Sequence, residues 1–128
     1  RTKTVSGAFE SVAFDLTNAI VNRGLKVESE GFVSKMLDRT KDATGKASPY
    51  IVGRYYTFCS AALSQATMEA NPDNSAACPY VLFAYELKLS PGKTVIGYRR
   101  PLAANDEASA KALGAIEKLL KGIIDEVG

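Results

Sequence analysis

Apolar residues along this chain follow two different spacings, and the alternation between the two predicts the order of helices and strands. Four stretches carry an apolar residue every three or four positions, which is the spacing of one helix face. The first predicted helix has apolar residues from Phe9 to Ile20 and ends at Gly24, and a short second one runs from Phe32 to about Arg39. The third begins at Ser60 and ends at Asn71-Pro72. The last begins at Asn105-Asp106-Glu107 and carries an apolar stripe from Leu113 to Val127.

Five further stretches are short, rich in β-branched and aromatic residues, or apolar at every second position, and these predict strands. The predicted strands are Thr2–Val5, Leu25–Glu30, Tyr50–Cys59, Cys78–Leu89 and Thr94–Arg100. Lys41–Ser48 is predicted to be a loop, and Ser90-Pro91-Gly92-Lys93 a hairpin turn. One face of the third strand is predicted to carry Tyr50, Val52, Arg54, Tyr56 and Phe58.

This order of elements predicts a two-layer α+β fold, with a mostly antiparallel curved sheet and helices packed on one face. The two long amphipathic helices each need a sheet face to cover their apolar stripe. The other sheet face is then partly exposed or used in a dimer. We find no repeat or linker, and 128 residues fit a single domain spanning 1–128.

Composition and charge restrict the classes of function. A net charge of +2 gives no electrostatic argument for binding nucleic acid or an anionic membrane. No apolar run approaches the roughly 20 residues that span a bilayer. The chain contains no histidine, which removes Ser-His-Asp and Cys-His catalysis, the common zinc sites and the usual haem ligand. We therefore assign no catalytic residue and no metal ligand, and we name no cofactor.

The two cysteines, Cys59 and Cys78, flank the predicted third helix and are the most informative feature of the chain. Three interpretations stay open. They form a disulfide or redox pair, they are two small buried apolar residues, or they are half of a soft-metal or cofactor site completed by Met68 or by a second subunit.

The tyrosines on the predicted strands suit core packing, dimer contacts or a stacking platform for an aromatic ligand or single-stranded nucleic acid. Without an RNA-recognition motif, we favour packing and dimer contacts. Glu86 is expected to form an ion pair with Arg54 or Arg99, or to line a pocket. Besides the cysteines, the candidate ligand-binding residues are Tyr56, Met68, Tyr80, Glu86 and Arg54.

The segment between the cysteines also carries a family resemblance. The elements Phe58-Cys59, Leu63 with Ala66, Asn71-Pro72, Cys78 and Ala84-Tyr85-Glu86 resemble the domain-of-unknown-function family 302, an uncharacterised prokaryotic family. One departure is Pro79, which follows the cysteine where other members tend to have proline before it. The resemblance implies a TATA-binding-protein-like arrangement of helices on a curved antiparallel sheet, often in a homodimer, and it implies no activity.

Together these observations predict a non-enzymatic binding or interaction module, homodimeric, with a small ligand between the sheet and the helix that the cysteines flank. The alternatives are a thiol-dependent redox or sulfur-handling enzyme that uses Cys59 or Cys78, and a haem- or metal-binding protein with ligands other than histidine. We expect no nucleic-acid or membrane partner. A first residue other than Met fits a processed protein or a shortened chain, so the expected location is periplasmic or secreted, with cytoplasmic as the alternative.

Overall fold

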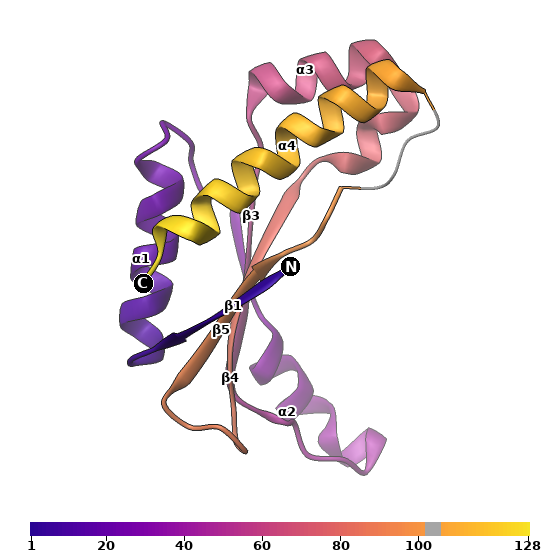
Figure 1. The fold of residues 1–128 in the computed structure, drawn as a ribbon. Helices are drawn as coiled ribbons and strands as arrows, with labels where there is room; N and C mark the ends of the chain where they lie inside the picture. Colours follow the sequence, from indigo (N-terminus) through magenta and orange to yellow (C-terminus); the bar gives the residue numbers. More distant parts are fainter. Residues whose placement is uncertain (102–105) are drawn as a thin grey trace.

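In the computed structural model, which describes residues 1–101 and 106–128, the chain forms one antiparallel sheet with helices packed against it (Figure 1). The strands are β1 (Thr2–Ser6), β2 (Ser29–Phe32), β3 (Tyr50–Phe58), β4 (Tyr80–Leu87) and β5 (Lys93–Tyr98). The helices are α1 (Phe9–Val21), α2 (Val33–Thr44), α3 (Ala61–Ala70), the short 3-10 helix η1 (Pro72–Ala77) and α4 (Glu107–Glu126). The predicted α+β class and antiparallel sheet are confirmed.

The strands lie in the order β1-β5-β4-β3-β2, and each neighbouring pair is antiparallel. A hairpin joins β4 to β5, and its turn contains Gly92 at a φ of 82°, a left-handed conformation that glycine adopts without strain. The longer connection from β3 to β4 contains α3 and η1. Because β4 is the central strand, its side chains occupy the middle of both sheet faces.

One face of the sheet forms the hydrophobic core with α1 and α4, which lie on the same side of it (Figure 1). Tyr80, Leu82 and Ala84 of β4 point to this side, and each is 2% exposed or less. Ile96 of β5 is fully buried beside them. The helices supply the predicted apolar stripes, whose buried residues are Phe9, Val12, Ala13, Leu16, Ala19 and Ile20 on α1 and Leu113, Ile116, Leu120 and Ile123 on α4.

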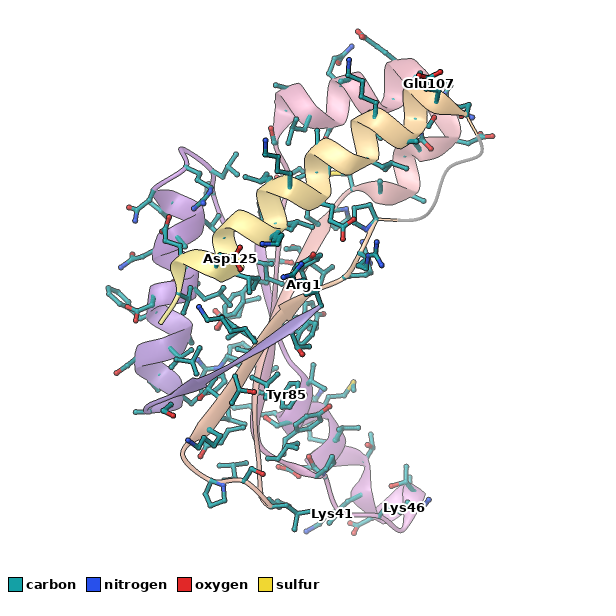
Figure 2. The ribbon with its side chains drawn as sticks, in the orientation of Figure 1. Arg1, Lys41, Lys46, Tyr85, Glu107 and Asp125 are labelled. Atoms are coloured by element: carbon teal, nitrogen blue, oxygen red, sulfur yellow. A yellow bond between two sulfur atoms is a disulfide. The ribbon has the colours of Figure 1, made fainter. Side chains whose placement is uncertain are left out.

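Helix α2 lies on the opposite face, at the β2–β3 end of the sheet. The Ser34 hydroxyl accepts a hydrogen bond from the Gly53 backbone N–H at 3.1 Å, which fixes the first turn of α2 against β3. Tyr85 of β4 lies on the α2 side of the sheet (Figure 2). Helix α2 therefore lies outside the predicted layer of helices, and it covers only part of the opposite face.

The sequence prediction ended α2 too early. The predicted end was about Arg39 and the predicted loop Lys41–Ser48, but the helix continues to Thr44 and stops at Gly45, whose φ is 71°. The last turn extends away from the sheet toward solvent (Figure 2). It therefore needs no apolar residues, and hydrophobic spacing does not reveal it.

The predicted strand Leu25–Glu30 is also misplaced, because β2 begins at Ser29. Leu25 and Val27 pack against the core from the preceding segment. Their alternation with polar residues therefore reflects contact with the core, whereas pairing with β3 involves residues from Ser29 to Phe32. The strands predicted as Tyr50–Cys59, Cys78–Leu89 and Thr94–Arg100 are correct to within two residues at each end.

A shift of register between Tyr50 and Val52 corrects the predicted face of β3. The sequence placed Tyr50 on the same face as Tyr56. The irregularity instead brings the Tyr50 ring beside Tyr85, with ring centroids 5.6 Å apart, on the face that carries α2. Period-two alternation cannot predict this, since one extra residue reverses the facing of everything before it.

The start of α4 agrees with its predicted acidic cap. The Asp106 carboxylate accepts a hydrogen bond from the Ser109 N–H at 2.7 Å, and this bond lowers the pKa of Asp106. Asn105, which the prediction also placed at this start, lies outside the described residues. Among the helices of the described ranges, none combines the length and hydropathy needed to cross a bilayer.

Candidate functional site

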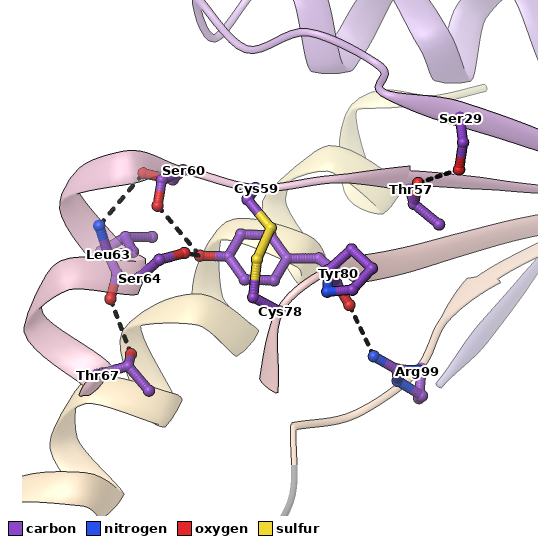
Figure 3. Close-up of a disulfide and its surroundings, with 11 residues drawn as sticks. Ser29, Thr57, Cys59, Ser60, Leu63, Ser64, Thr67, Cys78, Tyr80 and Arg99 are labelled. Atoms are coloured by element: carbon purple, nitrogen blue, oxygen red, sulfur yellow. Dashed lines mark hydrogen bonds between the residues drawn. A yellow bond between two sulfur atoms is a disulfide. The ribbon is translucent and has the colours of Figure 1, made fainter. Parts of the chain in front are cut away.

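The two cysteines form a disulfide that joins the end of β3 to the start of β4 (Figure 3). Their Cα atoms are 6.3 Å apart, within the usual range for such bonds. Both residues are half-buried, and α3 and η1 lie within the loop that the bond closes. Of the three interpretations of the cysteines, the structure therefore supports covalent pairing.

Hydrogen bonds around the disulfide attach α3 to the sheet. The Ser60 hydroxyl caps α3 by accepting the Leu63 N–H at 3.3 Å. The Tyr80 hydroxyl is 2.9 Å from the Ser64 hydroxyl (Figure 3). The Tyr80 ring packs edge-on against Phe58 with centroids 5.5 Å apart. The disulfide and these side-chain contacts together connect β3, α3 and β4.

The other predicted ligand-binding residues do not converge. Tyr56 is 2% exposed in the core, where burial raises the pKa of its phenol. Met68 is half-buried on α3, and Tyr80 lies beside the disulfide. Glu86 accepts a hydrogen bond from the Gly92 N–H at 2.9 Å, so it stabilises the hairpin turn. The predicted ion pair of Glu86 with Arg54 or Arg99 is therefore wrong.

Arg54 pairs with α1 instead. Its guanidinium donates to the two Glu10 carboxylate oxygens at 3.0 and 2.6 Å, and Glu30 lies 3.9 Å away. The hydrogen bond to Arg54 lowers the pKa of Glu10, and the same bond raises the pKa of Arg54. Because the Glu10 side chain is 71% exposed, water screens the pair. Arg54 thus links β3 to α1 on the core side of the sheet.

The face opposite the core carries a group of aromatic and apolar side chains, and these include tyrosines for which the sequence indicated packing, dimer contacts or stacking. We call it the aromatic face and define it by Tyr50, Tyr55, Val81, Phe83, Tyr85 and Val95. Strand pairing brings its members together. Tyr55 lies opposite Phe83, and Tyr85 lies opposite Val95. Three of the six tyrosines therefore belong to this face, while Tyr56, Tyr80 and Tyr98 belong to the core.

Glycines opposite the aromatic residues flatten this face. Gly97 pairs with Phe83, and a Cβ on Gly97 would lie 2.5 Å from the Phe83 ring. In the same way the Tyr55 ring covers Gly31, its partner on β2. Each ring lies over the space that a missing side chain leaves on the neighbouring strand. Gly97 lay inside the predicted strand Thr94–Arg100 and was the available signal, because such glycines often mark a close approach, whereas Gly31 fell outside the predicted strands.

A cavity of about 180 Å³ occupies the angle between α2 and the aromatic face. We call it the aromatic corner. Its side-chain walls are Val33, Tyr50, Tyr55, Phe83 and Tyr85, and Gly53 lies at its floor. The rings of Phe83 and Tyr85 are nearly parallel, at 11° with centroids 6.1 Å apart. This is an apolar concavity with aromatic walls, smaller than the usual small-molecule pocket.

A second cavity, of about 230 Å³, lies between η1, the start of β4, the residues that follow β5, and α4. Its lining includes Ala77, Tyr80, Ile116 and Leu120, with Arg100 at its edge. Arg100 forms an ion pair with Glu117 at 2.9 Å. No group of three or more cysteine or acidic residues within 1–101 and 106–128 is placed to hold a metal ion.

Comparisons with known proteins agree with the predicted resemblance. The family described as Domain of unknown function DUF302 matches residues 1–127. The crystal structure of an uncharacterised conserved DUF302 protein from Bacillus stearothermophilus superposes with a TM-score of 0.83 at 20% identity, over 100% of this chain and 97% of that one. A comparison with curated proteins finds no match. The fold and the sequence match together place this chain in the DUF302 family.

Proposed function

We propose that the domain is a non-enzymatic interaction module that forms a homodimer through the aromatic face. The observation that carries the proposal is the β4–β5–β1 part of this face. There Phe83, Tyr85 and Val95 are half-buried, and no described helix packs over β5 and β1 on this face, since α2 contacts the sheet through β3. A contiguous apolar sheet surface of this kind marks an interaction site more often than a solvated surface.

A second copy is the partner that fits this surface. The two central rows of the aromatic face, which carry Phe83 and Val95, hold no charged side chain, and β1 continues them with Thr2 and Thr4. Lys93 lies at the end of this face, where its ammonium group donates to the Ser6 hydroxyl at 2.8 Å. Two such surfaces can therefore meet without burying an unpaired charge, whose desolvation would oppose association. Aromatic residues are enriched in interface cores for the same reason.

The size of the surface favours one arrangement. With strands about 4.8 Å apart and a rise of about 3.3 Å per residue, the uncovered part measures roughly 350 Å² in projection. A stable interface takes about 800 Å² from each partner, so contact between the two sheets alone is too small. A two-fold arrangement in which α2 of each copy lies on β1 and β5 of the other adds the missing area, including Met36, which is 45% exposed.

The disulfide has a structural role in this proposal. It connects β3 to β4, the two strands that carry most of the aromatic face. Disulfides persist in oxidising compartments, so we place the domain in the periplasm or outside the cell. A redox function would instead require exchange with an external thiol. Mixing the oxidised protein with glutathione and measuring mixed disulfides by intact mass separates these roles.

Val95→Arg is expected to convert the dimer into a folded monomer. Val95 lies in the middle of β5 on the uncovered part, where the new guanidinium would be buried unpaired in the interface. We expect the dimer dissociation constant to rise about 100-fold or more, equivalent to about 2.7 kcal/mol. Sedimentation velocity over a concentration series measures it, and far-ultraviolet circular dichroism verifies the fold.

Phe14→Arg is the matched control, because Phe14 is 63% exposed on α1, in the layer on the other side of the sheet. It should leave the dimer intact. Thr4→Arg, at an exposed position of the edge strand β1, provides a second disruptive variant that leaves the core untouched. A monomeric wild type, or dissociation by Phe14→Arg alone, would overturn the proposal.

A further inference from the structure

We propose that the aromatic corner is a binding site for a small, neutral, planar aromatic molecule. This inference does not rest on the proposed dimer, because α2, β3 and β4 of a single copy supply all the walls. It is carried by the volume of the corner, the arrangement of its rings, its lack of charge and its free hydroxyl groups.

The volume sets the size of the ligand. The corner is an open concavity of about 180 Å³. An apolar cavity of about 150 Å³ in another protein holds one benzene molecule. The corner therefore accommodates one six-membered ring with a small substituent. Gly53 leaves this space open because it has no side chain. A Cβ added there would lie 3.5 Å from the Tyr50 ring, and the φ of Gly53 is one that other residues also adopt.

The rings of the corner favour an aromatic ligand over an aliphatic one of the same size. Tyr50 meets Tyr85 edge-on, at 63° with centroids 5.6 Å apart, while Phe83 lies nearly parallel to Tyr85. The corner thus presents both ring faces and ring edges. An aromatic guest gains offset-stacked and edge-to-face contacts with such walls beyond the area it buries, whereas a saturated ring gains only the burial.

The electrostatics of the corner favour a neutral ligand. No acidic or basic side chain contributes to its walls, because Arg54, which borders it on β3, directs its guanidinium to Glu10 on the core side. Burying a ligand charge without a partner would oppose binding. Within residues 1–101 and 106–128, the hydroxyls of Tyr50, Tyr55 and Tyr85 have no protein hydrogen-bond partner. The Tyr55 hydroxyl lies over Gly31 of β2, whereas a hydroxyl, carbonyl or ring nitrogen of the guest can pair with any hydroxyl that faces the corner.

Phenol and cyclohexanol form the matched pair of probes, because both are neutral six-membered rings with one hydroxyl and they differ in aromaticity. Benzoate adds a test of charge. We expect saturable phenol binding with a dissociation constant near 1 mM, and at least tenfold weaker binding of both other probes. Titrations followed by ¹⁵N–¹H correlation spectra measure each constant and locate the shifted amides, which should belong to β3, β4 and α2.

Gly53→Val fills the corner and should weaken phenol binding at least tenfold. Tyr85→Leu keeps an apolar side chain but removes one aromatic wall, and it provides a second reading if Gly53→Val does not fold. Gly114→Ala is the control, since Gly114 is exposed on α4 with open space around it. Equal binding of phenol and cyclohexanol, no saturable phenol binding below about 10 mM, or wild-type affinity in a folded corner variant would overturn the inference.

Measurements on Thr4→Arg separate this inference from the proposed dimer. Thr4 lies on the edge strand β1, which β5 separates from β4 and the corner. Phenol binding by both wild type and Thr4→Arg supports the site whatever the oligomeric state. A dimeric wild type without phenol binding would overturn the ligand site and leave the dimer in place. A monomeric wild type that binds phenol would overturn the dimer and leave the ligand site in place.

Discussion

Replacing Cys59 and Cys78 together by serine is expected to lower the free energy of unfolding by about 3 kcal/mol, the loop-entropy contribution of a disulfide that closes a loop of this length. The two residues are 19 positions apart, and the bond restricts the segment between them even when the chain is unfolded. The double replacement avoids leaving a free thiol. Urea denaturation followed by circular dichroism measures the change.

The double variant should still fold, because α3 keeps contacts that do not depend on the bond. Helix α3 packs against α4, and the Asn74 side chain of η1 donates both to the Thr67 carbonyl of α3 at 3.0 Å and to the Ser109 hydroxyl of α4 at 2.8 Å. Reducing the wild type with a phosphine should reproduce the same loss of stability. Serine variants as stable as the oxidised wild type would show that the disulfide does not stabilise the fold. The redox alternative would then become the better account of the two cysteines.

Hydrophobic spacing in the sequence was sufficient to predict the layer of α1 and α4. Helix α1 buries its apolar stripe against one sheet face, and α4 buries its stripe against the same face and against α1 and α3, so burial imposes the 3.6-residue period on both sequences. Residues Tyr80 to Leu87 alternate for the corresponding reason, since alternate positions point into and away from the core. Elements that cover the core thus leave a pattern that one sequence reveals.

The candidate site left a weaker pattern, because it depends on relations between strands. Phe83 covers Gly97 only when β4 and β5 pair in one register, and neither residue alone indicates that contact. The facing of Tyr50 depends on a register shift. Alternation placed Arg54 on the correct face, but it could not identify Glu10 as the partner of Arg54 or the Gly92 N–H as the partner of Glu86. Partner choice requires the three-dimensional arrangement of α1 and the hairpin turn.

The disulfide and the aromatic face are connected through β3 and β4. The bond fixes one end of this strand pair, and the other end carries the aromatic corner. Loosening the bonded end should therefore leave the pairing of Tyr55 with Phe83 intact, since that pairing depends on the strand ladder. On this account, reduction lowers the stability of the domain while dimerisation and phenol binding persist under conditions in which it stays folded.

Gly97→Ala is expected to lower the free energy of unfolding by about 1–3 kcal/mol, the usual cost of adding a methyl group to a well-packed site. The new Cβ would lie 2.5 Å from the Phe83 ring and 2.6 Å from the Arg1 carbonyl oxygen. The ring can rotate away, but the carbonyl belongs to the backbone. Thermal and urea denaturation measure the loss, and the ring current of Phe83 in NMR spectra reports its displacement.

Gly114→Ala is the matched control and should change stability in the opposite direction. Gly114 lies within α4, where a Cβ would meet nothing within 4 Å. Alanine in an exposed helix position stabilises by roughly 0.5–1 kcal/mol relative to glycine, because it restricts the unfolded chain. Adding Phe83→Leu to Gly97→Ala should recover part of the loss, since the smaller side chain leaves room for the methyl group. A Gly97→Ala variant as stable as Gly114→Ala would contradict the close packing of Phe83 over Gly97, and with it the inference that glycines flatten the aromatic face.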